Sequence, residues 1–497
     1  MCVGGYIGFE AQRGRDLVGP SLSAIAVILK GSRESESAVQ KALDTLKARP
    51  EEKAHLISGQ NGTLCGYVGC LNSVGKELSK VSRKVRSVFI GTHGFLMAPP
   101  AKSGKLPDEG FSGRTLDLII GQAARQKGGW SFLGTDDGQL LAGRDIIGQR
   151  PLFHGTNKCF AAISSCRKAL WSLGISDVDC VASGTICELG RADYREQRIG
   201  ELCNPRPSSL TEDEAADRIV EALTASVESA TRNTRRVGIL FSGGVDSSFV
   251  AAAAKRLGLE THLYTSAFEG SSQLTSAERS ADLLGLSLKV KETSFNEVEE
   301  VLERVIWVVE SPDPVQACVG MTIDVAARFA VEMGGESLLL SGSGADEVFG
   351  GYSKYAQAYR EQRSESAEYR MFRDILNLGR GDLLRDGAIA EANRVQLLAP
   401  FLDLDLVKLG LGIPVGLKLG QSSDDLRKGV LRKAAEKMGV PHEIAWAPKK
   451  AAQYSSGSLA SVKTLAKGKD MALNDYLQSI FRQVFGEYCS LIERYGR

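Results

Sequence analysis

The amino-acid sequence predicts an α/β protein of two domains: an N-terminal α+β domain built mainly from sheet, and a C-terminal domain with a doubly wound parallel sheet. The chain has 497 residues, more than one hydrophobic core usually organises. Residues 1 to about 200 contain short glycine-rich runs typical of strands, such as GGYIGF and SAIAVILKG. Beyond them, apolar strand-like runs alternate with helical segments, the pattern of a parallel sheet covered by helices.

Composition narrows the class of protein. Hydrophobic residues make up 43% and charged residues 24% of the chain, which argues against a disordered, fibrous or membrane-spanning protein. The net charge of +1 offers no electrostatic case for a nucleic-acid or membrane partner. No secretory signal and no apolar run of about 18 residues is visible, so we expect a cytoplasmic protein. The 10 cysteines form no CxxC pair; we expect reduced thiols and no structural zinc.

A proline-rich connector, CNPRPSSLTEDEAADR at residues 203–218, marks the domain boundary. We therefore expect domains at residues 1–204 and 205–497. The Ser/Thr and acidic residues of this segment predict the start of a helix over about 211–232.

The buried-strand run RRVGILF follows, then SGGVDSS, the helical run FVAAAAKRLG and the strand THLYTSAF. This order is a βαβ unit. Helices are expected around 294–310 and 316–334, and mainly helix after about 353.

The loop SGGVDSS predicts a pyrophosphate-binding site. Its glycines let backbone N–H groups approach phosphate oxygens, and its serines can donate hydroxyls at a helix N-terminus; these residues are Ser242, Gly243, Gly244, Ser247 and Ser248. The loop is not of the GxxxxGK[ST] type, and Asp246 would place a carboxylate beside phosphates, which requires a bridging Mg²⁺. We expect ATP cleavage between the α and β phosphates. The alternative is a plain Ser/Gly turn.

A second glycine-rich loop, SGSGADEVFGGY at residues 341–352, follows the apolar run LLL. In an open parallel sheet both loops would lie at the carboxyl edge of the strands, where ligands bind. Asp346 and Glu347 could then hold the Mg²⁺–pyrophosphate unit, and Gly342 and Gly344 would let backbone lie against the nucleotide. The alternative is a turn with two solvated acids.

These loops, the APFLD run at residues 399–403, LRKGVLRKAAEKMG and PKKAAQYSSG together resemble the synthetase domain of glutamine-dependent asparagine synthetases, over about residues 210–460. The resemblance implies an ATP-pyrophosphatase domain. It implies that a substrate carboxylate attacks the α phosphate and that ammonia displaces AMP from the acyl-adenylate. Aspartate, ATP, Mg²⁺ and glutamine or ammonia are the implied ligands, and a homodimer is compatible with it.

The resemblance also implies roles for individual residues. Leu240 and Ser266 would contact adenine and ribose through backbone atoms, and Ser341 and Gly342 would complete the nucleotide pocket. Asp246 and Asp346 are the implied metal ligands.

Basic residues near the C-terminus complete the implied site. Lys428 matches the family lysine that stabilises charge at the adenylation centre, with Arg432 supporting it. The alternative is that this segment is a solvated helix face. Lys449, Lys450 and Gln453 resemble the family's loop over the active site.

The N-terminal domain resembles the family's class II glutaminase (Ntn) domain. The run AGRDIIGQRPLFH, residues 142–154, is similar to the closing ARDxxGxxPL segment. Cys2 would become N-terminal after loss of Met1 and could act as nucleophile with its own amino group as base. The resemblance implies that it attacks glutamine and releases ammonia.

Several positions depart from the family pattern. Arg33 in SRESES is the only candidate for the glutamine carboxylate. Gly91, Thr92, His93 and Gly94 replace an Asn-Gly-Glu stretch that supplies an oxyanion donor, and Arg114 stands where an acid holds the substrate ammonium. Either glutaminase activity is retained, or the domain is a relic and free ammonia or another amine is the nucleophile.

The acid specificity is open for a similar reason. Ser343 occupies a position where the family often has Glu, and Gln396 and Leu398 stand for a Glu and an Arg before the PFLD run. The function hypotheses are therefore an asparagine synthetase, an acyl-adenylating amide ligase for another acid with an inactive glutaminase domain (as in β-lactam-forming relatives), and a non-catalytic scaffold.

The first prediction separates the two domains. The variant Cys2→Ala should lose amide formation from glutamine and keep amide formation from ammonium, because the thiol serves only the release of ammonia. Product formation with ATP and aspartate measures both reactions. Loss of the ammonium reaction in this variant would contradict the division of labour.

Overall fold

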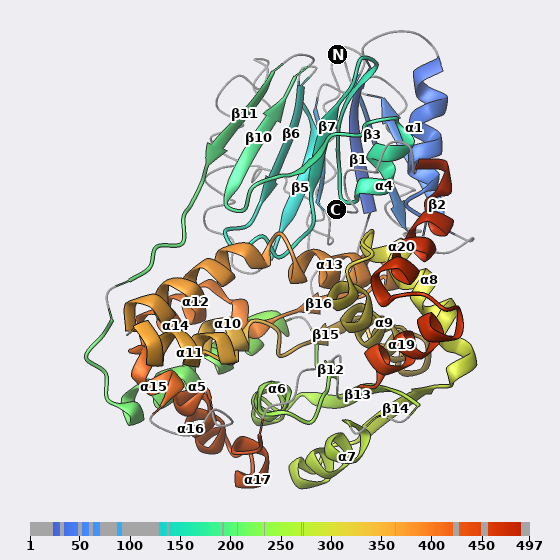
Figure 1. Ribbon diagram of the computed structural model, residues 1–497. Helices are drawn as coiled ribbons and strands as arrows, with labels where there is room; N and C mark the ends of the chain where they lie inside the picture. Colours follow the sequence, from blue (N-terminus) through green and yellow to red (C-terminus); the bar gives the residue numbers. More distant parts are fainter. Residues whose placement is uncertain are drawn as a thin grey trace. The chain divides into compact units, whose positions relative to one another are not determined.

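The computed structural model describes residues 23–29, 34–47, 52–58, 63–69, 87–91, 129–136, 139–190, 193–205, 207–232, 234–269, 271, 273–362, 364–420, 427–448 and 456–488. The chain divides into two compact units, one formed by residues 1–201 with 485–497 and one formed by residues 202–484. Both appear in Figure 1, and each is described by itself. No helix of the described residues has the length and apolar character needed to cross a bilayer.

The first unit is an α+β structure with two antiparallel sheets (Figure 1). One sheet has the order β2-β3-β1-β8-β7-β9 and the other has the order β11-β10-β6-β5-β4. Their strands are β1 (Ser23–Leu29), β2 (Lys53–Ser58), β3 (Thr63–Gly69), β4 (Ser87–Gly91), β5 (Ser131–Asp136), β6 (Gln139–Arg144), β7 (Phe153–Thr156), β8 (Phe160–Ser164), β9 (Val178–Cys180), β10 (Thr185–Leu189) and β11 (Tyr194–Arg198). Helices α1 (Glu34–Asp44) and α4 (Arg167–Ser172) accompany them.

The core of this unit lies between the sheets, because small and branched side chains from both are fully buried together. Ala26 of β1 and Ile163 of β8 lie in one cluster with Leu140 and Ala142 of β6 and Cys187 of β10. Alternating residues of each strand point to this core, as expected for two sheets packed face to face.

The segment after β6 is fixed by two buried charged side chains. The Arg144 guanidinium donates to the carbonyl oxygens of Arg150, Val181 and Gly148 at 2.7 Å each. The Asp145 carboxylate accepts backbone N–H groups from both sides of the turn, at 2.8 Å from Gly148 and 3.2 Å from Trp130. Burial raises the pKa of Asp145, while Arg144 and these N–H groups lower it. The family-like AGRDIIGQRPL run is therefore a structural turn in this unit.

The second unit is built on a five-stranded, wholly parallel sheet in the order β14-β13-β12-β15-β16. The strands are β12 (Arg236–Leu240), β13 (Glu260–Phe268), β14 (Leu288–Thr293), β15 (Leu338–Leu340) and β16 (Gln396–Leu398). The fully buried LLL of β15 and the buried centre of β12 explain why these strands read as apolar runs. The predicted α/β fold class is confirmed.

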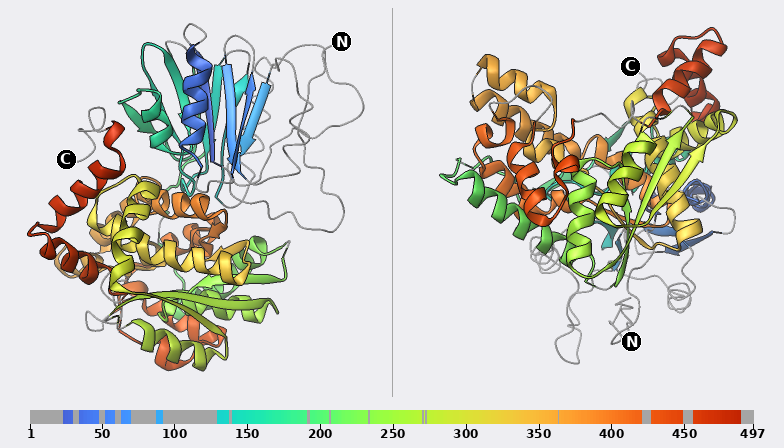
Figure 2. Two further views of the ribbon diagram at one scale, coloured as in Figure 1. Left: turned by 90° about the vertical axis from the view of Figure 1, so that its right-hand side faces the viewer. Right: turned by 90° about the horizontal axis from the view of Figure 1, so that it is seen from below.

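Helices cover both faces of this sheet (Figures 1 and 2). Helices α6 (Val245–Arg256) and α7 (Gln273–Leu284) lie on one face, and α8 (Val298–Val309), α9 (Pro314–Gly334) and α13 (Asp382–Asn393) lie on the other. The remaining elements of this unit are α5 (Glu212–Ala230), η1 (Phe295–Glu297), α10 (Ala345–Phe349), α11 (Ser353–Gln362), α12 (Ser364–Leu378), η2 (Pro400–Leu402), α14 (Leu404–Gly412), α15 (Val415–Leu419), α16 (Gly429–Met438), α17 (His442–Ala445), α19 (Ser458–Gly468) and α20 (Leu473–Val484). The short helix η3 (Gly486–Tyr488) belongs to the first unit.

Helix starts in this unit follow from local chemistry. Thr211 caps α5 by accepting the N–H of Glu214, whose side chain returns a bond to the Thr211 backbone. Asp313 caps α9, and Pro314 occupies its first position. The predicted helix over about 211–232 therefore exists, with a capping box at its first turn.

One buried cation in this unit has its pKa lowered by burial. Lys418 of α15 is 1% exposed, and burial lowers its pKa to about 7, with Glu368 raising it slightly. A lysine in the unfolded chain has a pKa of about 10.4. Between these two values the unfolded chain binds a proton that the folded chain does not. Stability therefore rises with pH through this window, and the full penalty applies below pH 7.

We therefore predict that Lys418→Met stabilises the protein at pH 7 by on the order of 3 kcal/mol, because the stem stays packed and no charge is buried. The gain should shrink as the pH approaches 10. Urea unfolding over this pH range measures it, with the exposed Lys408→Met as control. Equal stabilisation at every pH would contradict the assignment.

Candidate active site at the carboxyl edge of the parallel sheet

The two glycine-rich loops meet at the carboxyl edge of the sheet. The first follows β12 and the second follows β15, and these strands are neighbours although about a hundred residues separate them in the chain. After β12 the chain continues to β13, toward one edge of the sheet, and after β15 it continues to β16, toward the opposite edge. The two loops therefore flank a topological switch point, which is where ligands bind in such sheets.

Gly342 is the point of closest approach between the loops. A Cβ atom at this position would lie 2.9 Å from Asp246 Cβ and 3.1 Å from the Ser247 nitrogen. The absence of a side chain at Gly342 therefore lets the second loop lie directly against the start of α6.

The SGGVDSS loop presents backbone N–H groups and serine hydroxyls at the start of α6. Gly243 has φ of +75°, and a Cβ there would lie 2.8 Å from Ala277 Cα of α7, so glycine is required. Gly244 is the N-cap and supplies no capping side chain. Ser242 and Ser247 share a hydroxyl contact of 3.3 Å. These donors and the helix dipole suit an anionic ligand.

The last serine of the loop is placed differently. Ser248 is completely buried, and its hydroxyl has no hydrogen-bond partner within the described part of the chain. Its N–H donates to the Gly244 carbonyl at 3.1 Å, as the first turn of α6 requires.

The central feature of the site is a lysine between two carboxylates. Lys428 Nζ lies 2.7 Å from both carboxylate oxygens of Asp246, in the first loop. The same nitrogen lies 2.5 Å from Asp346 Oδ1, in the second loop. The side chain of Lys428 is 2% exposed, and those of Asp246 and Asp346 are 24% and 21% exposed. Three residues predicted separately for the site thus form one ion cluster.

This geometry rules out the solvated-helix alternative for Lys428. Burial alone would lower its pKa, but the attraction of Asp246 and Asp346 outweighs burial and raises the pKa, so the amine stays charged. Helix α16 begins only at Gly429, and Lys428 is its N-cap, in the left-handed region at φ of +68°. The predicted placement inside a helix is wrong by this one residue.

Two residues that the sequence did not single out by role, Gly351 and Arg427, hold Lys428 in position together with Arg432. A Cβ at Gly351 would overlap the Asp346 carboxylate and Lys428 Cε. Arg427 donates from Nε to the Gly351 carbonyl at 2.8 Å. Arg432, predicted as a support, donates to the carbonyls of Arg427, Ala445 and Ala447 at 2.6–2.8 Å. The only local indication of a special role for Gly351 was its place in the GGY sequence that ends the second loop.

Glu347 lies beside this cluster but is directed elsewhere. The Tyr352 hydroxyl donates to Glu347 Oε1 at 2.7 Å, and Glu347 is 4% exposed. Burial first, and then Asp346, raise the pKa of Glu347 to about 7. The alternative of two solvated acids is therefore wrong for this loop. Of its two acids, it is Asp346 that contacts Lys428.

The residues predicted for the nucleotide lie at the ends of neighbouring strands. Leu240 ends β12, and Ser341 follows β15, its N–H donating to the Leu398 carbonyl at 2.9 Å. Ser266, near the end of β13, is buried and donates its hydroxyl to the Thr322 carbonyl at 2.8 Å, so its backbone is fixed. Ser456 adds a strand-like bond, accepting from the Phe268 N–H at 2.9 Å.

Several predicted residues lie outside the described residues. They are Cys2, Arg33, Thr92, His93, Gly94, Arg114, Lys449, Lys450 and Gln453. Gly91 is described and is the last residue of β4.

The carboxylates fit a metal only together with a ligand. Within the residues that the structure describes, no three His, Cys, Asp or Glu side chains gather as a metal-binding group. Asp246 and Asp346 supply two carboxylates, and Mg²⁺ typically takes one or two carboxylates with phosphate oxygens and water. The donor set therefore fits Mg²⁺ bound to a nucleotide, while Lys428 neutralises the same carboxylates without one.

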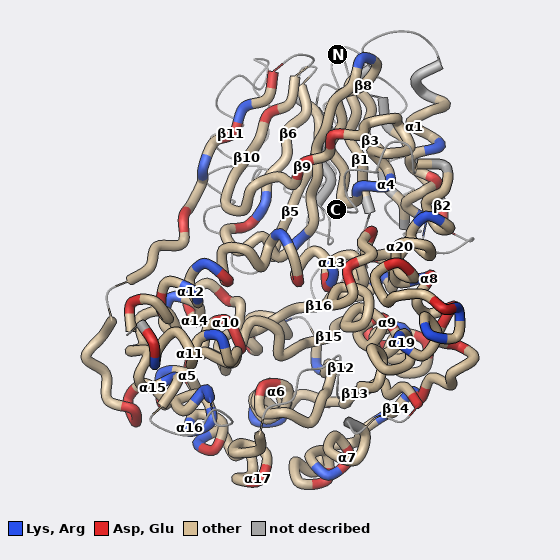
Figure 3. The backbone as a smooth tube through the Cα atoms, viewed as in Figure 1, with Lys and Arg blue, Asp and Glu red and all other residues tan. Residues whose placement is uncertain are grey.

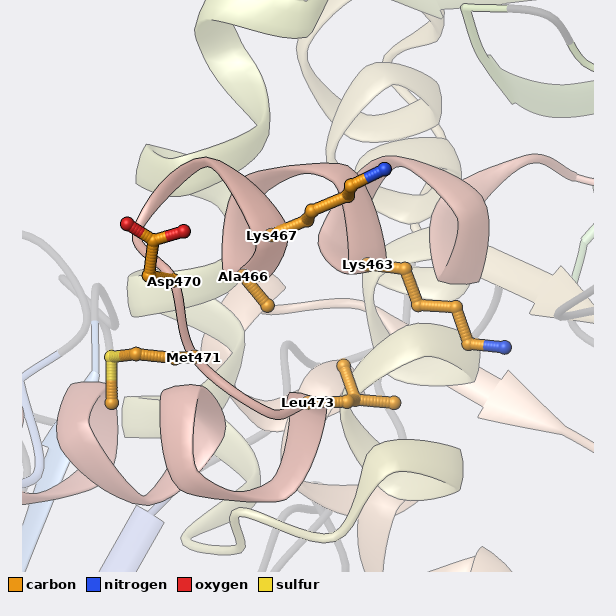
Figure 4. A pocket seen from close by; sticks show the side chains of 6 residues that line it. All are labelled: Lys463, Ala466, Lys467, Asp470, Met471 and Leu473. Atoms are coloured by element: carbon orange, nitrogen blue, oxygen red, sulfur yellow. The ribbon is translucent and has the colours of Figure 1, made fainter.

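Among the described residues, the charged side chains outside this ion cluster indicate no second ligand site. Basic and acidic residues are interspersed along the described chain (Figure 3). A hollow of about 330 Å³ on α19 and α20 contains none of the predicted site residues (Figure 4); it is lined by Lys463, Ala466, Lys467, Asp470, Met471 and Leu473.

Comparisons with known proteins agree with this geometry. A family model described as asparagine synthase matches residues 218–369 and 359–485. The putative asparagine synthetase [glutamine-hydrolyzing] 1 of Methanocaldococcus jannaschii is 32% identical over 395 residues, which cover 69% of this chain and 72% of that protein. The asparagine synthetase [glutamine-hydrolyzing] of Cricetulus griseus is 28% identical over 392 residues, covering 72% and 67%, and that of Homo sapiens is 27% identical with the same coverage.

The fold and the matched region together define an ATP-dependent carbon–nitrogen ligase. The chain belongs to the asparagine synthase family.

The ion cluster predicts how the site binds a divalent cation. Without nucleotide the wild-type protein should bind Mn²⁺ weakly, because Lys428 already pairs with both carboxylates. Lys428→Met should bind Mn²⁺ at least about 10-fold more tightly, since each lost ion pair frees a carboxylate. Loss of the free Mn²⁺ signal in electron paramagnetic resonance measures this. Equal affinity in both proteins would contradict it, and so would a gain of the same size in a Lys428→Met/Asp246→Asn control, which lacks one of the two carboxylates.

Proposed function

We propose that the chain adenylates a carboxylic acid with ATP and forms an amide with ammonia, releasing AMP and pyrophosphate. Aspartate is the first candidate acid, so the first candidate product is asparagine. In this proposal residues 1–204 are a type-2 glutamine amidotransferase-like domain, residues 205–497 are the synthetase domain, and the enzyme works in the cytoplasm. The observation that carries the proposal is the placement of Lys428 between the carboxylates of the two glycine-rich loops.

Each part of the cluster has a physical task in adenylation. The N–H groups at the start of α6 and the hydroxyls of Ser242 and Ser247 would hold the pyrophosphate portion of ATP. Bound Mg²⁺, held by Asp246 and Asp346, would neutralise charge on the phosphates. Lys428 would turn from the carboxylates to the α phosphate, where charge develops as the substrate carboxylate attacks.

Fixed backbone at the strand ends would serve the nucleoside. Ser266 is locked by its bond to Thr322, and Ser341 by its bond to Leu398. Backbone polar groups held this firmly can recognise adenine and ribose without reorganisation. The nearby Gly342 lets this loop lie directly against the start of α6.

A second candidate function is adenylation of a different acid. Leu398 ends β16 where the family carries an Arg, so it offers no cation for a second carboxylate. The guanidinium of Arg385 in α13 is already paired with Asp382 and Asp386 at 2.8 Å each. This pairing favours an acid without the second carboxylate of aspartate. The nitrogen source is equally open, because the predicted glutamine-binding residues depart from the family pattern.

ATP–pyrophosphate exchange tests the proposal. With Mg²⁺, exchange should depend on an added acid, beginning with aspartate and extending to amino acids and monocarboxylic acids. Asp246→Asn should lower the rate by about 100-fold or more, because it removes a carboxylate at the phosphates. Asp217→Asn, which breaks only the surface pair with Lys437, is the matched control. No exchange with any acid would favour the scaffold hypothesis, and exchange that needs no acid would contradict adenylation of a carboxylic acid.

A further inference from the structure

An ionisable side chain is built into the apolar packing beside the proposed site. Lys418 of α15 is 1% exposed, whereas lysine is almost never fully buried unless its charge is paired. Helix α15 contributes Val415 to a core cluster that includes Tyr355 of α11, and the rings of Tyr352 and Tyr359 pack against that cluster. The buried amine therefore belongs to a helix whose packing is otherwise apolar and aromatic.

The charged group that acts on the Lys418 amine is Glu368 of α12, which attracts it. Other titratable groups on the helices around α15 are engaged with one another. The Tyr355 hydroxyl donates to Asp374 at 2.5 Å, and Lys354 pairs with the same carboxylate. The aromatic side of the core therefore gives the amine no second carboxylate through these groups.

Helix α16 packs on α15 as well, and its charged side chains are directed to other partners. These pairs are Arg432 with the Ala445 carbonyl, Lys433 with Glu212, Glu436 with His442, and Lys437 with Asp217. Burial therefore dominates the environment of the Lys418 amine, and the attraction of Glu368 opposes it only in part.

Helix α15 touches the chain on both sides of the ion cluster. A Cβ atom at Gly350 would lie 2.7 Å from Leu419 Cδ2, and the next residue, Gly351, adjoins Asp346 and Lys428. A Cβ atom at Gly429, which follows Lys428 directly, would lie 3.1 Å from the Leu417 carbonyl oxygen. Because packing this close leaves no slack, a displacement of α15 would shift both segments that carry the cluster.

The backbone of α15 is a short element that depends on this packing. It has five residues, and its turn is closed by the Gly420 N–H, which donates to the Gly416 carbonyl at 2.9 Å. Isolated helices of this length are unstable in water, and local opening costs less free energy than global unfolding. Opening of α15 is therefore the least costly way for a charge to leave this core.

We propose that proton uptake by Lys418 switches the site off: the charged amine moves toward water, α15 leaves its place between Gly350 and Gly429, and Lys428 loses its position between the two carboxylates. Burial lowers the pKa of Lys418 to about 7, and Glu368 raises it. Above pH 7 the neutral amine favours the packed helix, and below pH 7 the charged amine favours the open one. The effect on activity rests on the proposed function.

Hydrogen–deuterium exchange of the full chain without ligands tests the structural part. The reporter amides are Gly420 and Arg432, whose N–H donates to the Lys428 carbonyl at 2.9 Å. After correction for the intrinsic pH dependence of exchange, their protection should fall about 10-fold from pH 8 to pH 6, because an amine with a pKa of about 7 is neutral in roughly one molecule in ten at pH 6. Lys418→Met should show no such fall, whereas the exposed Lys408→Met should behave as wild type.

ATP–pyrophosphate exchange tests the effect on the site. The ratio of the wild-type rate to the Lys418→Met rate should fall about 10-fold from pH 8 to pH 6, in step with the protection. Glu347 also titrates near pH 7, but it is present in both proteins, so the ratio isolates Lys418. In Glu368→Gln the fall should lie at lower pH than in wild type, because the attraction that favours the charged amine is gone.

The outcomes separate the switch from the activity on which it acts. Equal protection at pH 8 and pH 6 in the wild-type protein would overturn the inference, as would the same fall in Lys418→Met. A fall in protection with a constant ratio of rates would overturn the link to the site. Absence of ATP–pyrophosphate exchange at every pH would overturn the proposed function instead, and hydrogen exchange would still decide whether α15 opens.

Discussion

One buried cation shared by two carboxylates organises the second unit around its site. Lys428 comes from the segment before α16, Asp246 from the start of α6 and Asp346 from the start of α10. Three separate segments of the chain must therefore pack in their native positions before the three charged groups can contact one another. An unpaired buried lysine would cost several kcal/mol, so this pairing ties the geometry of the site to the stability of the unit.

The parallel sheet makes that meeting possible. Strands β12 and β15 lie side by side, and their carboxyl ends release the two loops at the same edge. Glycines then remove the side chains that would separate the loops: Gly342 at Asp246, and Gly351 at Asp346 and Lys428. The order of the strands thus places the three charged side chains at one edge of the sheet, and the glycines allow the backbone segments to approach closely enough for these side chains to make contact.

Patterns within single segments were enough to predict strands β12, β13 and β15 and the two loops, while the basic segment near Lys428 came from the family resemblance. An apolar run reports burial, and a glycine-rich turn between strand and helix reports a phosphate-type site, because each depends on neighbouring residues alone. The contact of Lys428 with Asp246 spans 182 residues, and that of Asp386 with Ser343 spans 43. No local pattern encodes such pairs, so the contacts of Gly351, Arg427 and Asp386 emerged only from the fold. In the first unit the resemblance identified a segment whose charges, Arg144 and Asp145, serve the turn itself.

The left-handed backbone of Lys428 sets two demands on a single position. Its φ of +68° suits glycine, and asparagine among the residues with side chains, whereas lysine there costs about 1 kcal/mol. The charge at the site, however, requires the long amine. Glycine at this position would relax the backbone and leave the two carboxylates without a cation, so backbone strain and the ion cluster set opposite demands on this residue. A stabilising design that considers backbone strain alone would therefore choose glycine here and remove the cation that Asp246 and Asp346 share.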